Sequence, residues 1–238
     1  MIKFFRRIRQ RILINNKGTE NNFRKYLFYA LGEIVLVVIG ILIALQINNW
    51  NEERKSEANT LIMLKQLKQE NTANMLDLIV DKTARESTYP KMLKFNSFLA
   101  KQDIEKERDS LRVYLAEFFI STSYSFSESY LMSYINSNTK ENSILSTALV
   151  DLHSLQEQLT YISEKGMDSR FENFYNVLVK DIDFTNLEIN SYETLKSFEF
   201  RNKIIMMAIV EQAITTQYNA TLQQQQKVDS IITKFLKE

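Results

Sequence analysis

The longest apolar stretch of the sequence lies near the N-terminus, between two polar regions. It covers the 22 residues 26–47, among which Glu33 is the only charged one. A helix of this length spans about 33 Å at roughly 1.5 Å per residue, enough to cross a hydrocarbon core of about 30 Å. Tyr26 and Trp50 stand near its two ends, where aromatic rings favour the headgroup layer. We therefore predict a transmembrane helix over residues 26–47.

Beyond Trp50 the pattern becomes that of helices in water. Residues 51–59 mix charges of both signs around one apolar residue, Ala58, and predict a solvated stem. Apolar residues then recur every three or four positions from Leu61 to Leu78, which is typical of a helix with one buried face. The same spacing near the C-terminus predicts a second long helix whose apolar face holds Met206, Val210, Ala213, Gln217, Ala220, Gln224, Val228, Ile231 and Phe235.

Residues that break helices are rare in this chain. The 238 residues include only four Gly and one Pro, too few for the turns that β-sandwiches or α/β folds require. We therefore predict an all-α fold, in which the transmembrane helix continues into an elongated extracytoplasmic helical bundle. The predicted divisions are a basic cytoplasmic tail over 1–25, the transmembrane helix over 26–47, a solvated helical stem over 48–60 and the bundle over 61–238.

The few helix-breaking residues set the predicted boundaries. Pro90 is expected to end the first long helix, because its ring cannot take part in an interior helical bond. Gly166 is expected to end a later helix as a left-handed C-cap, and Asp168 to cap the next helix, which reaches about Lys180. The other predicted helices cover residues 91–100, 110–119, 127–136, 141–164 and 192–236.

The distribution of charge predicts the orientation of the chain in the membrane. Residues 1–25 carry eight basic side chains and one acidic one, a net charge of +7, whereas the rest carries 22 basic and 28 acidic groups, a net charge of −6. Basic flanks of a span stay on the cytoplasmic side. We therefore predict an inner (cytoplasmic) membrane protein with its N-terminus in the cytoplasm and its bundle in the periplasm.

The apolar stretch is too long for a typical cleaved signal peptide, whose apolar region covers about 7–15 residues and ends in an A-x-A-like site. An uncleaved signal anchor is the preferred interpretation. Before it, Phe5, Ile8 and Ile12 have helical spacing among basic residues, which predicts either a short helix on an anionic inner leaflet or a disordered basic tail.

Glu33 has two interpretations. It shares one helix stripe with Val37, Gly40, Ala44 and Ile47, a spacing that two packed helices use. Small residues allow helices to approach closely in lipid, and a polar group on the same face gains an interhelical hydrogen bond. Glu33, Gly40 and Ala44 therefore form a candidate docking face for a second copy or a membrane partner. Alternatively, Glu33 reaches the nearby headgroups.

The same region resembles a known family. The run GEIVLVVIGILIALQINNWNEERK (residues 32–55), preceded by the basic opening MIKFFRRIRQ, is similar to the signature of an uncharacterised family of single-pass proteins common in Bacteroidota. The resemblance implies an inner-membrane anchor with an extracytoplasmic domain, and it implies no activity. Residues 118–149 resemble a Ser/Thr/Tyr-rich segment of that family but have Met132-Ser133-Tyr134 where the family has a Ser-Gly pair.

Candidate catalytic and metal-binding residues are sparse. The chain has no Cys and one His, His153, and the neighbouring Asp151 would point elsewhere on the same helix. Asp181 and Asp183 resemble the start of a calcium loop, but the following residues lack the glycine and the final acidic ligand, so a turn or capping role is preferred. We therefore predict no enzyme activity, no cofactor and no metal. We also predict no nucleic acid partner, because the acidic outer domain would repel phosphate groups.

An aromatic cluster remains as a candidate recognition surface. Tyr124, Phe126, Tyr130 and Tyr134 alternate with serines in a segment without strong periodicity. Such residues can line a binding face or close the end of a bundle, and the sequence leaves both interpretations open. We predict a non-enzymatic, membrane-anchored scaffold or assembly protein that forms a homo-oligomer or binds a membrane partner. The alternative is a periplasmic ligand-sensing accessory subunit that acts through a membrane partner.

Overall fold

The computed structural model describes residues 22–101, 103–118, 123–137 and 143–237. The predicted basic tail, residues 1–25, lies outside the described residues except for its last four. The chain divides into two compact units, residues 1–60 and 61–238. The fold is all-α, as predicted from the scarcity of glycine and proline, with one two-stranded hairpin as the exception.

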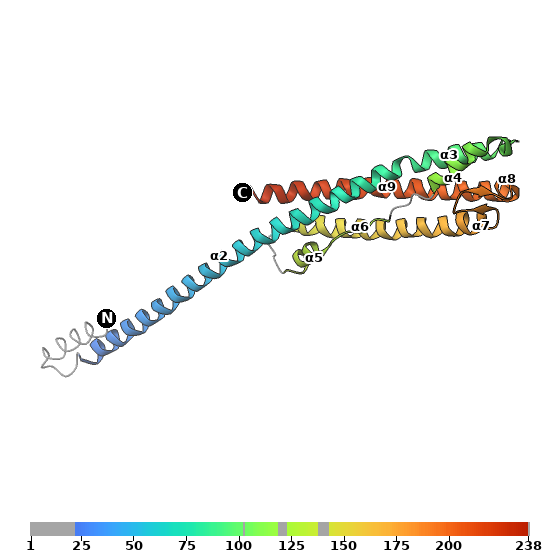
Figure 1. Ribbon diagram of the computed structural model, residues 1–238. Coiled ribbons are helices and arrows are strands. Elements are labelled where there is room, and N and C mark those ends of the chain that lie inside the picture. The colour runs from blue at the N-terminus through green and yellow to red at the C-terminus, as the bar shows by residue number, and fades with distance from the viewer. Residues whose placement is uncertain (1–21, 102, 119–122, 138–142, 238) are drawn as a thin grey trace. The chain divides into compact units, whose positions relative to one another are not determined.

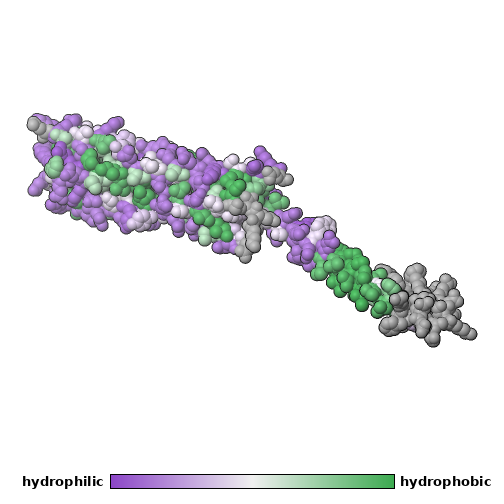
Figure 2. Space-filling view, turned by 180° about the vertical axis from the view of Figure 1, so that it is seen from behind, coloured by the Kyte–Doolittle hydropathy of each residue, from purple (hydrophilic) through white to green (hydrophobic). Residues whose placement is uncertain are grey.

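The first unit consists of one helix in its described part. Helix α2 (Asn22–Glu86) begins there, and every side chain from Tyr26 to Asn59 is exposed. Its apolar stretch is long and apolar enough to cross a membrane, and none of it is buried against other parts of the chain. Figure 2 shows this stretch as a continuous hydrophobic surface. The apolar helix predicted from the sequence is therefore present.

The second unit is a bundle whose long elements are the later part of α2, helix α6 (Ser143–Arg170) and helix α9 (Phe198–Phe235) (Figure 1). Lys68 of α2 donates to Thr233 at 2.6 Å, whereas Arg85, further along α2, contacts Glu211 at 2.8 Å. Residues later in α2 therefore contact residues earlier in α9. The two long helices are therefore antiparallel.

Helix α6 also runs antiparallel to α9. Gln224 donates its side-chain amide to the carbonyl of Ala148 at 2.8 Å, and Arg170, near the other end of α6, donates to Glu211 at 2.9 Å. Helix α5 (Ser129–Asn136) packs beside α6 at the end of the bundle that contains the C-terminus.

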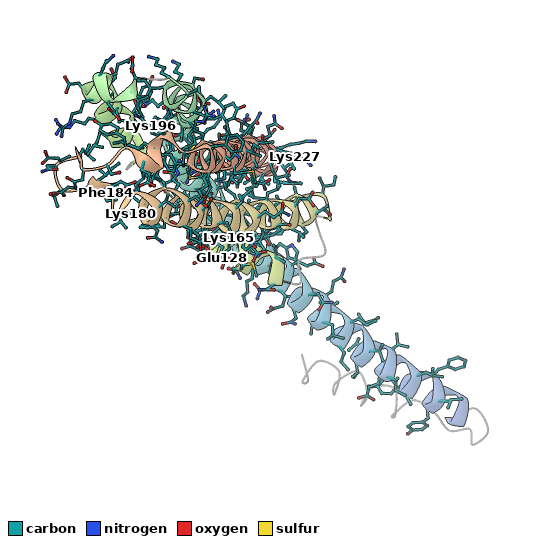
Figure 3. All side chains as sticks on the ribbon, turned by 90° about the vertical axis from the view of Figure 1, so that its right-hand side faces the viewer. Glu128, Lys165, Lys180, Phe184, Lys196 and Lys227 are labelled. Carbon is teal, nitrogen blue, oxygen red and sulfur yellow. The ribbon has the colours of Figure 1, made fainter. Side chains whose placement is uncertain are left out.

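The other end of the bundle is built from short elements. They are α3 (Thr88–Leu99), the 3₁₀ helix η1 (Ile104–Glu107), α4 (Arg108–Phe118), the π-helix η2 (Phe171–Tyr175), α7 (Asn176–Leu178), strands β1 (Ile182–Asp183) and β2 (Glu188–Ile189), and α8 (Glu193–Lys196). Ion pairs join neighbours there, as between Lys196 of α8, labelled in Figure 3, and Glu105 of η1. The sequence suggests that residues 90–190 build this end, but only α3 to α4 and η2 to α8 do so, because α5 and the start of α6 pack at the opposite end with Leu67 and Val228.

The break between α2 and α3 follows from Pro90. Helix α2 ends at Glu86 and α3 begins at Thr88, so that Pro90 lies in the first turn of α3. A proline has no N–H for the carbonyl four residues earlier, here that of Glu86, and its ring clashes with that carbonyl in a regular helix. The predicted end of the first long helix is confirmed.

The prediction for Gly166 is wrong. Helix α6 continues to Arg170, and no glycine of the described residues has a positive φ. A β-carbon at Gly166 would lie 2.5 Å from Cδ1 of Ile214. The glycine therefore permits close contact between α6 and α9. Asp168 caps no helix but lies within α6, where it pairs with Lys165 at 3.0 Å.

The region after α6 also differs from the prediction. Residues 182–189 form a β-hairpin, in which Leu187 has a φ of 57°. The helix predicted from residue 192 is divided at Ser197, whose extended backbone separates α8 from α9. The Ser197 side chain accepts a hydrogen bond from Phe200 N at 3.0 Å, which makes it the N-cap of α9.

The buried face of α9 is rotated by about one residue from the predicted face. Met206, predicted inside, is 63% exposed, and Ala213 is also exposed. The residues that the bundle buries are Phe200, Ile204, Met207, Ala208, Glu211, Ile214, Tyr218, Thr221, Gln225, Val228 and Ile232. Glu211, Thr221 and Gln225 among them are polar. Their hydropathy alone favours exposure to solvent.

Three apolar clusters make up the core along the bundle. One surrounds Leu67 and Val228, the second Leu78 and Tyr218, and the third Phe95, with residues from α3, α4, η2 and α9. Polar residues lie between the clusters in sequence on each long helix. The core thus alternates apolar clusters with polar layers.

The contact at Gly166 gives a prediction for stability. Gly166→Ala should reduce the free energy of unfolding by about 1–3 kcal/mol, the usual cost of overpacking, although alanine is the better helix former by about 1 kcal/mol. Ile214→Val removes the Cδ1 atom that the new methyl group meets and by itself costs about 0.5–1.5 kcal/mol. In urea unfolding, the double variant should be no less stable than Ile214→Val alone. Additive losses would show that the two sites do not touch.

Candidate functional site

One buried carboxylate of the bundle is held between two guanidinium groups. Glu211 Oε1 lies 2.8 Å from Arg85 Nη1, and Glu211 Oε2 lies 2.9 Å from Arg170 Nη2. The three residues are 2–4% exposed. They come from α9, α2 and α6 respectively, so that one charged layer joins all three long helices.

Burial explains why this arrangement needs all three partners. Removing a charge from water costs several kcal/mol, and only close, hydrogen-bonded opposite charges offset that cost. On α2, Arg85 lies seven residues after the buried Leu78 and thus on the same side of the helix. The fold therefore places a charge where helical spacing predicts an apolar residue.

Burial and the charge of Arg85 also shift the pKa values of titratable side chains near the charged layer. The guanidinium of Arg85 lies 5.8 Å from the centre of the Tyr218 ring. Burial raises the pKa of Tyr218 to about 12, although Arg85 acts in the opposite direction. Burial also raises the pKa of the Asp81 carboxyl, against the attraction of Arg85. The positive charges of this layer thus act on side chains beyond the ion pairs.

A second polar layer is neutral. Asn71 donates to the backbone carbonyl of Gln225 at 3.0 Å, and the amides of Gln156 and Gln225 flank the Tyr124 hydroxyl. These amides and this hydroxyl are buried, and none of them has a hydrogen bond of good geometry within the described residues. Burial raises the pKa of Tyr124 to about 12. This layer lies between the cluster of Leu67 and that of Leu78.

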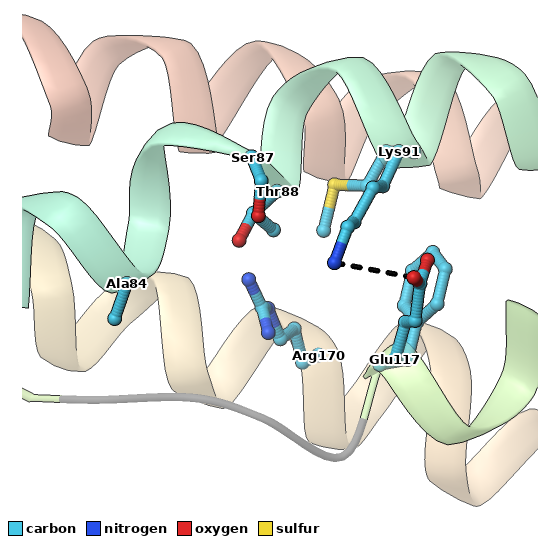
Figure 4. A pocket seen from close by; sticks show the side chains of 8 residues that line it. Ala84, Ser87, Thr88, Lys91, Glu117 and Arg170 are labelled. Atoms are coloured by element: carbon cyan, nitrogen blue, oxygen red, sulfur yellow. Dashed lines mark ion pairs between the residues drawn. The ribbon is translucent and has the colours of Figure 1, made fainter.

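A small cavity adjoins the charged layer at the break between α2 and α3. Its volume is about 30 Å³. Figure 4 shows the guanidinium of Arg170 pointing toward the side chains of Ser87 and Thr88, beside the ion pair of Lys91 with Glu117 at 3.1 Å. The remaining lining residues are Ala84, Met92 and Phe118. Pockets for small-molecule ligands usually have volumes of roughly 300–1,000 Å³. This cavity is much smaller and has room only for water-sized groups.

The predicted aromatic residues are divided between core and surface. Tyr124 and Tyr134 are 1% and 3% exposed and belong to apolar clusters, Phe126 is half-buried, and Tyr130 is 40% exposed. Most of this segment therefore packs within the bundle. Of these four residues, only Tyr130 exposes much of its side chain to solvent.

Polar side chains of α2 hold this segment in place. The Glu70 carboxylate accepts hydrogen bonds from the backbone N–H groups of Tyr130 and Leu131 at 3.0 and 2.9 Å, and thus caps the start of α5. The side-chain amide of Asn74 donates to the Ser127 carbonyl at 2.7 Å and accepts from the Ser127 N–H at 2.9 Å. No local sequence pattern predicts this cap, because Glu70 is distant in sequence from the helix that it caps.

His153 lies between two carboxylates. Its Nδ1 is 3.3 Å from Glu128, which precedes α5 (Figure 3), and its Nε2 is 3.5 Å from Glu157. Its ring makes an edge contact with Phe126. No serine or other nucleophile makes a hydrogen bond with this imidazole in the described part of the chain. The contacts of His153 are those of a residue that joins α6 to the segment before α5.

Asp183 has a local role in the hairpin. Its Oδ1 accepts hydrogen bonds from the backbone N–H and the hydroxyl of Thr185 at 2.9 and 2.6 Å. These bonds lower the pKa of the Asp183 carboxyl. In the ranges that the structure describes, no group of three or more His, Asp or Glu side chains is placed to hold a metal ion.

The predicted docking residues of the apolar helix lie on its exposed surface. Among the described residues of the first unit, Glu33, Gly40 and Ala44 are exposed, and a β-carbon at Gly40 would have no neighbour within 4 Å. The helix thus presents this face to whatever surrounds it, whether lipid or another helix.

These observations define an all-α chain with one exposed apolar helix, long enough to cross a membrane, and a bundle cross-linked by buried polar layers. Its sequence matches the model of DUF6090, a family of unknown function, over residues 33–213, and the chain belongs to this family. The match includes most of the apolar stretch and most of the bundle. No curated protein and no solved structure matches the chain.

The charged layer gives a sharp prediction. Glu211→Gln should reduce the free energy of unfolding by about 3–5 kcal/mol, because it leaves two buried guanidinium groups without their carboxylate. Glu199→Gln removes an exposed carboxylate from the same helix, where it pairs with Lys203, and should change stability by no more than about 0.5 kcal/mol.

A triple variant separates the cost of the broken set from any loss of packing. Arg85→Met, Glu211→Leu and Arg170→Met together remove every charge of the layer, and buried ion sets replaced by apolar groups often lose little stability. Urea unfolding should therefore show a smaller loss for the triple variant than for Glu211→Gln. Equal effects of Glu211→Gln and Glu199→Gln would contradict a structural role for the layer.

Proposed function

We propose that this protein is a non-enzymatic scaffold, anchored in the inner (cytoplasmic) membrane by one helix, that presents a helical bundle in the periplasm. The observation that carries the proposal is the exposed apolar stretch of α2, because no described residue of the first unit covers it. In water such a surface would be strongly unfavourable, at roughly 25 cal/mol per Å² of apolar area. A bilayer removes that cost.

The charge distribution supports the orientation. The net charge of +7 precedes the apolar stretch and the net charge of −6 follows it, and basic flanks stay in the cytoplasm. The basic segment suits anionic lipids of the inner leaflet, to which each nearby Lys or Arg contributes about 1 kcal/mol. The acidic outer domain would repel nucleic acid.

The scaffold proposal includes association through the apolar helix. Glu33, Gly40 and Ala44 share one side of α2, and the absence of a side chain at Gly40 permits close approach of a second helix. The proposed partner on this face is a second copy or another membrane protein. A scaffold would then act by holding several bundles, or a bundle and its partner, together.

A ligand-sensing accessory subunit is the alternative. It requires a pocket for a small molecule. The cavity beside Arg170 has a volume of about 30 Å³, which suits water rather than a metabolite, and its charged lining residues are engaged in ion pairs. A larger depression of about 480 Å³ lies beside α7 and α9, with Asn176, Lys180 and Phe200 in its lining, but it is more open to solvent. Ligand pockets bury most of the ligand surface, so we favour the scaffold.

The orientation can be measured with a reporter fused after Glu238. If the bundle is periplasmic, a reporter that is active only in the cytoplasm should be silent there, and one that needs the periplasm should be active. The same reporters fused within the basic segment, after Lys17, provide the reverse control. Cytoplasmic activity of the C-terminal fusion would overturn the proposed topology.

The docking face can be tested in a membrane association assay. Gly40→Leu should reduce self-association, because the new side chain forces paired helices apart. Glu33→Gln should keep much of it, whereas Glu33→Leu should weaken it by roughly 0.6–2 kcal/mol, the range for polar contacts in bilayers. Val35→Leu, off that stripe, is the control. If Gly40→Leu behaves like the control and Glu33→Leu changes nothing but insertion, Glu33 is a boundary residue and the docking face does not exist.

A further inference from the structure

Helix α2 carries an apolar stripe on its outer side within the bundle. Leu76 and Val80 are 58% and 68% exposed, and Ile79 beside them is 40% exposed. Ala73 and Thr83 extend the stripe in both directions and are exposed as well. The spacing of Ala73, Leu76, Val80 and Thr83 is three, four and three residues, which is the spacing of a seam between two helices.

The bundle itself cannot cover this stripe. Leu78 is fully buried against Tyr124, Leu159 and Ile214. Leu76 and Val80 stand two residues before and after it, and two residues turn a helix by about 200°. Their side chains therefore point away from the core that holds Leu78.

We propose that a second copy of the same chain covers this stripe, with the two α2 helices parallel. The inference rests on the proposed membrane anchor. Every anchored copy has the same orientation in the membrane and carries its stripe the same number of residues beyond the span. A pair related by a twofold axis then brings Leu76 against Leu76 and Val80 against Val80, as an isologous interface requires.

The charges beside the stripe suit such a pair. Asp77 is the one charged residue among residues 73–80. In a parallel seam with Ala73 and Val80 at the first core position and Leu76 at the second, Asp77 flanks the seam and faces position 72 of the other copy. That residue is Thr72, so no two carboxylates meet. Like charges therefore do not oppose parallel pairing.

The size of the stripe indicates which partner it fits. Stable interfaces between free proteins bury roughly 1,200–2,000 Å² in total, far more than a few side chains on one helix can supply. Linking two binding surfaces makes the second contact effectively intramolecular. A copy already held beside the first by its membrane helix meets this requirement, whereas a protein that diffuses freely does not.

Disulfide cross-linking tests the pairing directly, because the chain contains no cysteine. Single variants Leu76→Cys and Val80→Cys of the full chain would be oxidised briefly in native membranes and the covalent dimer quantified. Val150→Cys and Tyr161→Cys are matched controls, since these α6 residues are 51% and 65% exposed. We expect several-fold more dimer at residues 76 and 80 than at residues 150 and 161.

Cysteines in the span test whether the apolar helices pair, independently of pairing through the stripe. Val37→Cys and Ala44→Cys report on pairing of the span, with Val35→Cys as its control. If cysteines at residues 37 and 44 form dimer but those at 76 and 80 do not, pairing through the stripe is overturned and pairing of the span is not. If only residues 76 and 80 form dimer, pairing through the span face is overturned and pairing through the stripe is not. If residues 76 and 80 yield no more dimer than the α6 controls, or cross-link to a different protein instead, the second copy is not the partner.

Discussion

The ion pairs of Glu211 with Arg85 and Arg170 fix the way in which the three long helices meet. A buried carboxylate is stable only with its partners in place, and these partners come from two different helices. Rotating α9 by one residue toward the face that hydropathy favours would move Glu211 away from both guanidinium groups. The observed orientation of α9 therefore leaves Met206 exposed and places Glu211 between both arginines.

The neutral layer and the cap at Glu70 extend the same principle to the connecting segment. Glu70 and Asn74 bind the backbone around residues 127–131, and Tyr124 enters the core beside Gln156 and Gln225. Polar groups of α2 thus position a segment that has little regular structure of its own. The aromatic residues that suggested a recognition surface are for the most part held inside by these contacts.

A bundle with these features suits a supporting role. Its core follows the three long helices as three apolar clusters separated by polar layers, and the cavity beside Arg170 is of water size. What remains on the outer side of α2 is an apolar stripe that the bundle does not use. Membrane anchoring and pairing through α2 would together give a defined assembly, in which contacts too weak to act alone reinforce each other.

The sequence by itself determined the features that depend on local pattern. The scarcity of glycine and proline predicted the all-α fold, 22 residues with one charge predicted the apolar helix, and Pro90 predicted the break at Glu86, since each follows from short-range sterics or solvation. Only the tertiary structure decided the roles of Gly166, Glu70 and Glu211. The sequence predicts a helix end at Gly166 because glycine favours a left-handed cap, but the glycine is needed there because Ile214 of α9 approaches closely. Glu211 carries no local sign of burial, because its two arginine partners come from distant parts of the chain.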